Sequence, residues 1–402
     1  GLLSPPSAPT KKRPPLENRF SILHISYAKR SPANAGSPGP GRRLHSTTLL
    51  KISTLLSMSH ESGKETPAKP RLLLTGATGY LGSAFLQQAS RDYEIITLGR
   101  GRGTAPYPPG QDQAAPQVSD LSSQVSSFSS QVSAPRFHPC DLAADPIPAD
   151  ALSGVSVIVH LAGKAHALEE RPGEEEASYR AITVDGTRKL LEAAKSAGVQ
   201  RFIFASTVKV YPENPPTLLD ETAPTAPETP YGRTKLEAEK MVLHGGFVPE
   251  PVVLRFSMIH GGRETGNMEK MEEAIRRNRF PPIPEFGNQR SMVHIDDAVQ
   301  ALLLASGHKK APGEIFNVTN GNPISTRELY VQILQKQSRQ PPRWTIPLCA
   351  LKGLAKLGDG IGKVRGKRFV FDSDALGKLT GNAAFSSEKI QKELGFTPNR
   401  KI

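Results

Sequence analysis

The fold can be inferred from one segment, Thr75-Gly76-Ala77-Thr78-Gly79-Tyr80-Leu81-Gly82. Its glycines have G-x-x-G-x-x-G spacing, after the apolar run at 72–74 and before a predicted helix at about 83–90. Glycine lets the backbone turn tightly and approach a pyrophosphate, and the N-terminus of the next helix offers N–H groups to negative charge. This context favours a dinucleotide site over a simple turn. The predicted contacts are Gly76, Thr78, Gly79, Tyr80, Leu81 and Gly82.

The next part of the chain alternates strands and helices. Apolar runs at 95–98, 155–159 and 201–205 are typical of buried strands, and 179–197 is typical of a helix. The alternation predicts the α/β class, with a Rossmann-type doubly wound parallel sheet in residues 70–250.

Two regions depart from this alternation. Residues 101–135 are predicted to be a flexible insertion, because Ser-Ser-Gln-Val-Ser occurs there twice amid Pro and Gly. Residues 251–402 have a looser pattern and are predicted to form a smaller, mixed α/β lobe that holds the substrate. The helices expected in this lobe span about 267–277, 296–306 and 326–336.

The positive charge is concentrated at the N-terminus. Residues 1–57 contain nine Lys and Arg against one acid, Glu17, and so supply +8 of the net charge of +13. This Pro/Ser-rich composition predicts a disordered basic leader at 1–69 rather than a nucleic-acid partner. The leader is either translated sequence ahead of Met58, the first methionine, or an organelle transit peptide that ends near 42–48.

Composition also excludes several classes of protein. The two cysteines, Cys140 and Cys349, are too few for a disulfide framework and favour a reducing compartment. No apolar run approaches the roughly 18 residues that span a bilayer, so a cytoplasmic protein without a transmembrane segment is expected. We predict no metal, because the sequence contains no H-E-x-x-H, no paired C-x-x-C and no G-x-x-x-x-G-K-[ST].

The stretch 348–368 combines leucines with lysines and arginines. This pattern is compatible with a helix that lies on an anionic membrane surface or covers an anionic substrate. We favour a solvated helix with a basic face, because the glycines at 358, 360, 362 and 366 weaken a continuous helix.

Two further patterns carry chemistry. Tyr231 and Lys235 stand four residues apart, after Thr229 as predicted N-cap and Pro230 as first helical residue, so both share one helix face. A nearby ammonium favours the ionised form of a phenol, whose pKa is otherwise about 10. At the end of the second predicted strand, Arg100 stands where NAD-binding domains usually carry an acid, and arginine suits the 2′-phosphate of NADP. The arginine favours NADP(H), and NAD and NADP both remain cofactor candidates.

The motifs together resemble one family. The glycine segment is followed by Asp141-Leu142, His160-Leu161-Ala162-Gly163, Ala205-Ser206-Thr207 and Tyr231-Gly232-Arg233-Thr234-Lys235. Their order and spacing resemble the extended short-chain dehydrogenases, and the chain looks like the NAD-dependent epimerase/dehydratase family from about residue 71 to 398. The resemblance implies that Asp141 and Leu142 lie by the adenine. It also implies that residues 160–163, with Leu161, Ala162 and Gly163, line the cofactor.

The resemblance further implies a catalytic set of Thr207, Tyr231 and Lys235. Thr207 would hydrogen-bond the reacting sugar hydroxyl, Tyr231 would take or give its proton, and Lys235 would lower the pKa of Tyr231 and hold the nicotinamide ribose. A nucleotide-diphosphate sugar is the implied substrate, and a homodimer is the implied assembly. The implied substrate contacts are Lys164, Asn267 and Arg290.

Departures from the family pattern narrow the activity. Val208-Lys209 follow Thr207 where dehydratases carry an Asp-Glu pair, so a 4,6-dehydratase is not expected. Met258 replaces a phosphate-contacting asparagine, Thr183 replaces the asparagine of N-V-x-G-T, and the R-R-x-G-D motif is absent. The chain therefore resembles divergent branches of bacterial surface-polysaccharide synthesis that use N-acetylated sugars, rather than a standard uridine-diphosphate galactose epimerase.

Three functions stay open at this point. The intact catalytic set without dehydratase acids favours an NAD(P)-dependent nucleotide-sugar epimerase. Arg100 and Arg102 instead suit an NADPH-dependent 4-keto nucleotide-sugar reductase. A non-catalytic protein that keeps the fold for nucleic-acid binding or regulation would be expected to have an eroded catalytic set, and here the set is complete.

Overall fold

The computed structural model describes residues 69–100, 135–164, 174–261, 267–365, 369 and 371–399. All of them belong to the compact unit 67–402. The predicted disordered leader and the predicted flexible insertion lie outside the described residues, apart from Lys69 and Pro135 at their ends.

A seven-stranded sheet forms the centre of this unit. Its spatial order is β3-β2-β1-β4-β5-β6-β9, and all neighbouring strands are parallel. Because the strand order reverses between β1 and β4, the sheet is a Rossmann-type doubly wound sheet, and the predicted fold class is confirmed. The strands are β1 (Arg71–Thr75), β2 (Glu94–Gly99), β3 (Arg136–Pro139), β4 (Val155–His160), β5 (Arg201–Thr207), β6 (Glu250–Phe256) and β9 (Ile315–Val318).

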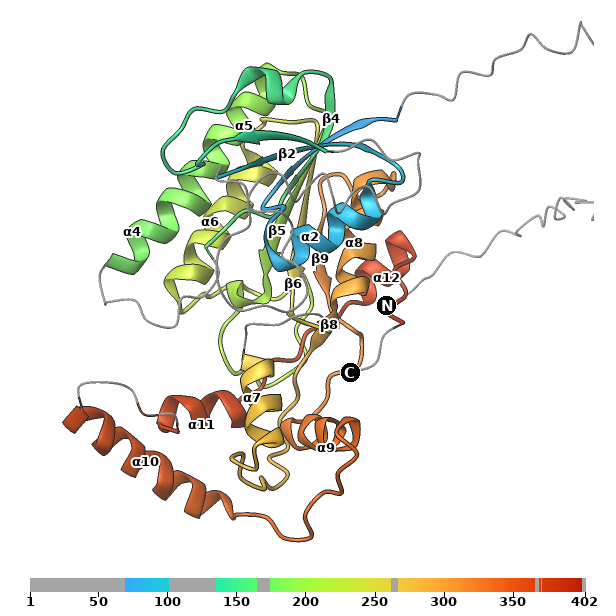
Figure 1. Cartoon of the computed structure of the whole chain (residues 1–402). Helices are drawn as coiled ribbons and strands as arrows, with labels where there is room; N and C mark the ends of the chain where they lie inside the picture. Colours follow the sequence, from blue (N-terminus) through green and yellow to red (C-terminus); the bar gives the residue numbers. More distant parts are fainter. Residues whose placement is uncertain are drawn as a thin grey trace, which may run out of the picture. The chain divides into compact units, whose positions relative to one another are not determined.

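Helices cover both faces of the sheet (Figure 1). One face carries α2 (Tyr80–Ala89), α8 (Ile295–Gly307) and α12 (Glu388–Leu394), and the other carries α5 (Gly186–Ser196) and α6 (Pro230–His244). Leu72 and Leu74 of β1 pack in the first layer and Leu73 packs in the second, because successive strand side chains point to opposite faces. Burial on both faces explains why the strands are apolar runs without polar alternation.

The helix predicted at 179–197 is divided in the structure. α4 (Glu174–Arg180) continues into a π-helical turn at Ala181–Asp185, and α5 follows directly. Within this turn Thr183 is fully buried, and its carbonyl accepts a hydrogen bond from Thr187 Oγ1 at 2.5 Å. Single 3-10 turns occur at Ala149–Leu152 and Val208–Val210.

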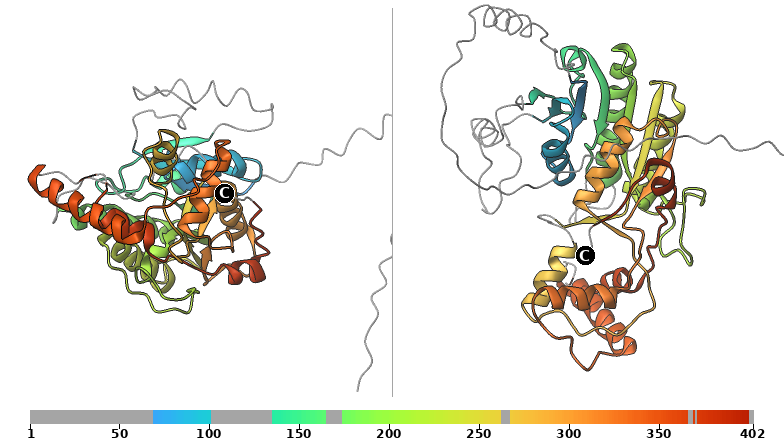
Figure 2. Two further views of the ribbon diagram at one scale, coloured as in Figure 1. Left: turned by 90° about the horizontal axis from the view of Figure 1, so that it is seen from below. Right: turned by 90° about the vertical axis from the view of Figure 1, so that its right-hand side faces the viewer.

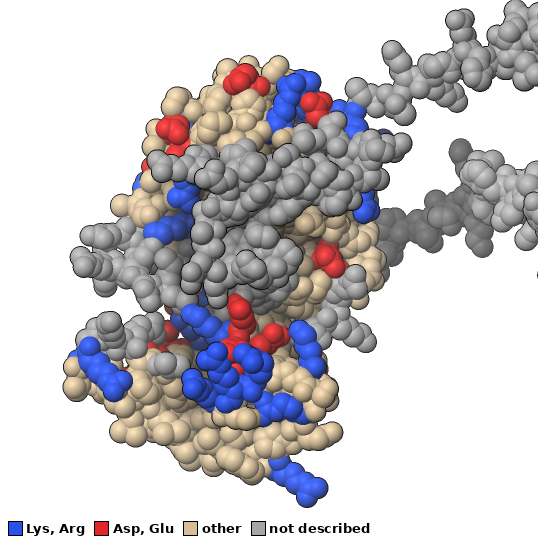
Figure 3. Space-filling view, in the orientation of Figure 1, with Lys and Arg blue, Asp and Glu red and all other residues tan. Residues whose placement is uncertain are grey.

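A smaller lobe lies beyond the carboxyl ends of the strands (Figures 1 and 2). It combines the parallel pair β7 (Met258–His260) and β8 (Met292–His294) with α7 (Asn267–Arg276), α9 (Thr326–Lys336), α10 (Leu348–Arg365) and α11 (Ser373–Thr380). Its helices share one apolar core, to which Met271, Ile333, Leu351 and Leu376 contribute. Lys and Arg side chains gather on the surface of this lobe (Figure 3).

Two features differ from the sequence-based expectations. The predicted boundary at residue 250 is not a single crossing from sheet to lobe. β9, α8 and α12, which come later in the chain, return to the sheet. Pairing of β9 with β6 joins distant segments, which no local pattern reveals. The glycines of 348–368 also do not interrupt the helix, since α10 is continuous to Arg365. A Cβ on Gly358 would lie 1.9 Å from the Phe371 carbonyl oxygen, so glycine permits close packing there.

Candidate active site

The glycine segment forms a backbone cradle between β1 and α2. Gly76 has a φ of +74°, and a Cβ there would lie 2.7 Å from the backbone nitrogen of Ala162. A Cβ on Gly82 would lie 2.0 Å from the Gly76 carbonyl oxygen, so neither position accommodates a side chain. Gly79 is the N-cap of α2 and leaves the helix without a side-chain cap. The cradle thus fits the pyrophosphate of a dinucleotide, which such backbone N–H groups bind.

A cavity of about 680 Å³ adjoins the cradle. Asp141 is fixed in its wall, since its Oδ1 accepts from the Ala143 nitrogen at 3.0 Å and its own nitrogen donates to Asp145 Oδ2 at 2.7 Å. The sequence-predicted residues that line the cavity are Gly76, Thr78, Gly79, Arg100, Asp141, Leu142, Leu161, Ala162, Gly163 and Lys164. Tyr80, Leu81 and Gly82 lie in the first turn of α2 instead.

His160 supports this wall from inside and does not line it. It ends β4 fully buried, with Nδ1 2.6 Å from Thr75 Oγ1 and Nε2 3.0 Å from Thr187 Oγ1. Because Thr187 donates to the Thr183 carbonyl, Nε2 carries the proton and Nδ1 accepts from Thr75. The expectation that His160 lines the cofactor is therefore corrected.

The same chain of hydrogen bonds reaches the cavity wall. Thr75 Oγ1 accepts from the backbone nitrogen of Ala162 at 3.1 Å, which joins the ends of β1 and β4. Burial, together with the charge of Lys235, lowers the pKa of His160 to about 3. The ring stays neutral at ordinary pH and can keep this arrangement.

Thr207 and Tyr231 meet at the carboxyl end of β5. Thr207 is the last residue of β5, and Tyr231 lies in the first turn of α6. This helix begins as expected, with Pro230 as first residue and Thr229 Oγ1 accepting from the Gly232 nitrogen at 3.1 Å. The Tyr231 hydroxyl forms a hydrogen bond with Thr207. Two hydroxyl groups from different elements thus lie next to each other.

Lys235 is buried one turn further along α6. Its side chain is 4% exposed, and its Nζ donates to the Ala205 carbonyl at 2.8 Å and lies 4.6 Å from the ring centre of Phe204. A Cβ on Gly163 would lie 3.3 Å from this Nζ. Lys235 therefore borders the cavity at Gly163, although it does not line the cavity itself.

Burial opposes the charged forms of both groups. It raises the pKa of Tyr231 to about 12, against the hydrogen bond with Thr207 and with a smaller contribution from Tyr179. It lowers the pKa of Lys235 to about 8, against the favourable charge of Glu239. The lowered Tyr231 pKa that the sequence predicts is not produced by these side chains alone.

A buried ion pair behind these residues was not predicted from the sequence. Glu239, one turn after Lys235, accepts from Ser206 Oγ and from Arg255 Nη2, the latter at 2.7 Å. The Arg255 and Glu239 side chains are only 4% and 2% exposed, and Arg255 Nη1 also donates to Tyr211 Oη at 2.8 Å. The available signal was an arginine inside the apolar strand 250–256 and a glutamate at helical spacing from Lys235.

The three predicted substrate contacts have different surroundings. Lys164 lines the cavity, and its Nζ donates to Ser178 Oγ at 2.9 Å. Asn267 begins α7, but its side chain lies outside the described residues. Arg290 does not line the cavity, and its guanidinium donates to the carbonyls of Lys378 and Gly381 at the end of α11.

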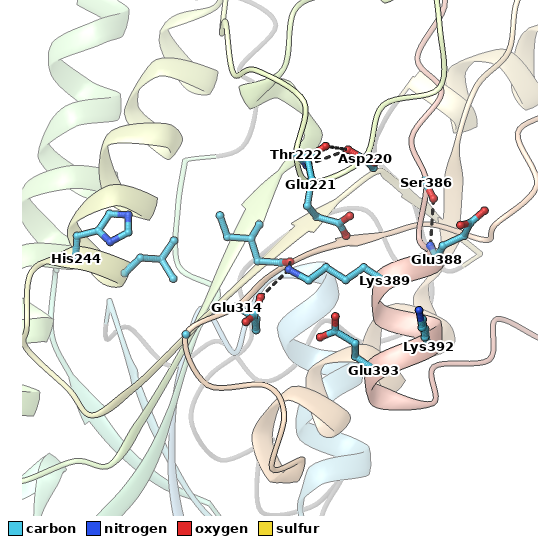
Figure 4. A pocket seen from close by; sticks show the side chains of 13 residues that line it. Asp220, Glu221, Thr222, His244, Glu314, Ser386, Glu388, Lys389, Lys392 and Glu393 are labelled. Atoms are coloured by element: carbon cyan, nitrogen blue, oxygen red, sulfur yellow. Dashed lines mark hydrogen bonds and ion pairs between the residues drawn. The ribbon is translucent and has the colours of Figure 1, made fainter. Parts of the chain in front are cut away.

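A second hollow of about 540 Å³ lies between the loop at 220–222, the start of β9 and α12 (Figure 4). Lys389 Nζ lies 2.7 Å from Glu314 Oε2 and also donates to the Ile315 carbonyl at 3.0 Å. None of the sequence-predicted site residues lines this hollow. Its central cation is already paired, so we assign it no ligand.

The described part of the chain contains no helix long and apolar enough to cross a membrane. Within the same residues, no group of three or more His, Cys, Asp or Glu side chains is arranged to hold a metal ion. The expected lack of a metal, the homodimer and the cytoplasmic location stay predictions.

Comparison with known proteins gives a consistent result. Residues 72–319 match the model of the NAD dependent epimerase/dehydratase family. A UDP-glucose 4-epimerase of Vibrio cholerae is 28% identical over 82% of this chain and 92% of its own length. An N-acetyl-alpha-D-glucosaminyl-diphospho-ditrans,octacis-undecaprenol 4-epimerase of Escherichia coli O157:H7 is 24% identical over 79% and 88%. The structure of UDP-glucuronic acid 4-epimerase from Bacillus cereus in complex with NAD has a TM-score of 0.57 and 21% identity, over 82% of this chain and 94% of that one.

The family match covers more than half of the chain. It begins in β1 and ends just after β9, so it contains the glycine cradle, Thr207, Tyr231 and Lys235. The chain is thus a member of the NAD dependent epimerase/dehydratase family, an enzyme of the extended short-chain dehydrogenase/reductase type that uses NAD or NADP.

Proposed function

We propose that this enzyme is a 4-epimerase of a sugar linked to a diphosphate, in the first place a nucleotide sugar. The observation that carries the proposal is the hydrogen-bonded pair of Thr207 and Tyr231, with Lys235 one turn away at the cavity wall. A hydroxyl acid–base pair beside a dinucleotide cradle suits reversible oxidation of an alcohol carbon. Both curated relatives described above are named as 4-epimerases, which supports C4 as the reacting carbon.

The cradle and the cavity wall would hold NAD, whose nicotinamide ring accepts a hydride and returns it. The N–H groups at the start of α2 suit the pyrophosphate, and the wall at Asp141 and Leu142 suits the adenosine half. Gly163, which lines the cavity and borders Lys235, would mark the end at which chemistry occurs.

Thr207 and Tyr231 would bind the C4 hydroxyl of the sugar. Tyr231, as a phenolate, takes the hydroxyl proton while the hydride leaves C4, and a 4-keto sugar results. After the keto sugar presents its other face, the hydride returns to C4 and Tyr231 gives the proton back. The cycle inverts C4 and consumes neither cofactor nor proton.

The charge of Lys235 supports this role of Tyr231. A phenol with a pKa of about 12 acts as a base only when its ionised form is stabilised. The ammonium of Lys235, one turn further along α6, would supply that stabilisation. The charge of Glu239 raises the pKa of Lys235 against the effect of burial and so favours the ammonium form. The Glu239 carboxylate is itself held in place by its buried ion pair with Arg255.

Lys164 and Arg290 remain the proposed contacts to the diphosphate. Lys164 is favoured by its position in the cavity wall, and its ammonium matches phosphate oxygens. For Arg290 the support is weaker, because its guanidinium already donates to two carbonyls of the lobe. Asn267 stays a proposal from the family resemblance alone.

A second candidate is an NADPH-dependent 4-keto nucleotide-sugar reductase. The observation that favours it is Arg100, which lines the cavity at the end of β2, where the 2′-phosphate of NADP would bind. Such an enzyme would consume NADPH in equal amount to its product, whereas an epimerase keeps its cofactor.

The test begins with the cofactor that the purified full chain retains. We expect stoichiometric NAD after denaturation and C4 inversion of a uridine-diphosphate sugar without net cofactor consumption. Tyr231→Phe should lower kcat by about 10²–10⁴-fold while NAD stays bound. The matched control is Tyr179→Phe, since this ring packs edge-on 5.9 Å from that of Tyr231. Stoichiometric NADPH oxidation would favour the reductase, and unchanged turnover of Tyr231→Phe would end the catalytic assignment.

A further inference from the structure

Exposed apolar side chains are concentrated on one element of the lobe. Among the described residues nine large apolar side chains are exposed, and seven of them lie between residues 344 and 369. Four form a row on α10, namely Leu354, Leu357, Ile361 and Val364, and Trp344 and Phe369 lie exposed near its two ends. These six residues are called the α10 face below.

The row follows from helix geometry. Leu354, Leu357, Ile361 and Val364 are spaced i, i+3, i+7 and i+10, which places them on one side of the helix. A different side, with Leu351 and Ala355, is buried in the lobe core. Leu357 and Val364 are 65% and 89% exposed, so α10 has one apolar side for the lobe and a second that the lobe does not cover.

The polar part of α10 is basic. The helix carries Lys352, Lys356, Lys363 and Arg365, all exposed, against the single acid Asp359. Asp359 is engaged by the lobe itself, because Oδ1 accepts from the Ser373 nitrogen at 3.0 Å and Oδ2 accepts from Ser373 Oγ at 2.5 Å. In Figure 3 the lower part of this lobe is mostly tan, with single basic side chains at its left end and lower edge, and the acidic side chains lie further up beside the main basic cluster.

We propose that the α10 face binds the surface of an anionic lipid bilayer, with α10 lying in the plane of the interface. A helix with an apolar side, a basic polar side and an aromatic residue near its end has the composition of an interfacial helix. Apolar side chains enter the boundary between headgroups and acyl chains, and lysines contact anionic headgroups. A second copy of the chain is the less suitable partner, because two basic helices would bring like charges together.

The α10 face would also orient the enzyme. α10 shares its apolar core with α7 and α11, and α11 ends at the carbonyls that bind Arg290. Attachment through α10 thus keeps the lobe beside the lipid headgroups and leaves the glycine cradle, in the sheet, free of lipid contact. The proposal goes beyond the reaction and stands whether the enzyme is an epimerase or a reductase.

The test uses the full chain and vesicles of phosphatidylcholine with or without phosphatidylserine, in a sedimentation assay. Because residues 1–57 are themselves basic, the informative comparison is between variants and not between lipids alone. Leu357→Glu should weaken binding to the anionic vesicles more than about tenfold, since it removes an exposed leucine that would enter the lipid interface and adds a repelled charge. The matched control, Leu218→Glu, changes an apolar side chain that is 50% exposed outside this region and should alter binding less than about twofold.

A second pair of variants separates the charge from the apolar contact. Lys356→Glu should weaken binding several-fold and more at low salt, whereas Lys240→Glu on α6 should not. Retained NAD and an unchanged melting temperature check that each variant is folded. Equal binding of Leu357→Glu and the parent, or equal binding to vesicles without phosphatidylserine, would overturn the proposal. So would a parent dimer that Leu357→Glu dissociates without any lipid binding, which would assign the face to a second copy.

Discussion

The cradle at the end of β1 is formed by backbone groups, whereas the lobe around α10 is formed by side chains. The cradle is made of backbone, because Gly76 and Gly82 leave no room for a Cβ and the groups offered are N–H groups at the start of α2. The lobe is made of side chains from four helices and carries its distinctive residues on the outside of α10. A site made of backbone can be recognised from a short motif. A site made of side chains depends on how distant segments pack.

The largest expected effect tests whether the cradle depends on glycines without side chains. Gly82→Ala should abolish measurable NAD binding, because the new Cβ would lie 2.0 Å from the Gly76 carbonyl oxygen. Gly377→Ala in α11 is the matched control, since a Cβ on Gly377 meets no atom within 4 Å and Gly377 does not line the cavity. Calorimetric titration with NAD checks both variants. Normal binding by Gly82→Ala would show that the cradle does not depend on the absence of a side chain.

Removing the buried ion pair tests whether the region behind Lys235 also depends on tertiary contacts. Arg255→Met should destabilise the protein by about 3–5 kcal/mol, because it leaves the Glu239 carboxylate buried without its cation. Arg180→Met is the control, since Arg180 of α4 pairs with Glu237 of α6, the helix that also carries Glu239, but both side chains are about half exposed, at 51% and 43%. Denaturant unfolding measures the difference. Similar losses for the two variants would contradict the special weight given to burial.

His160 gives the cradle a defined acid sensitivity. The pKa of His160 is about 3 when folded and 6.5 as a free side chain, so the unfolded chain binds an extra proton between these values. The free energy of unfolding should therefore fall by a few kcal/mol as the pH drops from 6.5 to 3. His160→Asn should remove this part of the slope, and the exposed His244→Asn should leave it intact. An unchanged slope in His160→Asn would point to other groups.

The smallest expected effect concerns the lobe. If Arg290 contacts the diphosphate, Arg290→Lys should raise KM up to about tenfold with kcat nearly unchanged, because a single ammonium replaces a planar fork of donors. Arg327→Lys is matched to it, since Arg327 also donates to a lobe carbonyl, that of Ile283, at 2.8 Å. Equal KM values in the two variants would assign Arg290 a structural role only.

Elements with a local signal were predicted from the sequence, and features that depend on distant contacts were not. β1, β2, β4 and β5 were predicted because a strand buried on both faces is a continuous apolar run, and the start of α6 was predicted from its cap and proline. The π-helical turn at 181–185 was missed, because one extra residue in a single turn is not visible in the spacing of apolar residues along a helix. The burial of His160, which removes it from the cavity wall, depends on contacts with β1 and α5 that lie far away in the sequence.

The sequence by itself determined the cradle, the order of the motifs and the family, because glycine spacing and the period of apolar residues are local properties of the chain. Only the tertiary structure decided that β9 and α12 return to the sheet and that Glu239 and Arg255 pair behind Lys235. It also decided that α10 keeps one apolar side uncovered. These features arise from contacts between segments far apart in the chain, and their energies depend on burial, which no single segment contains.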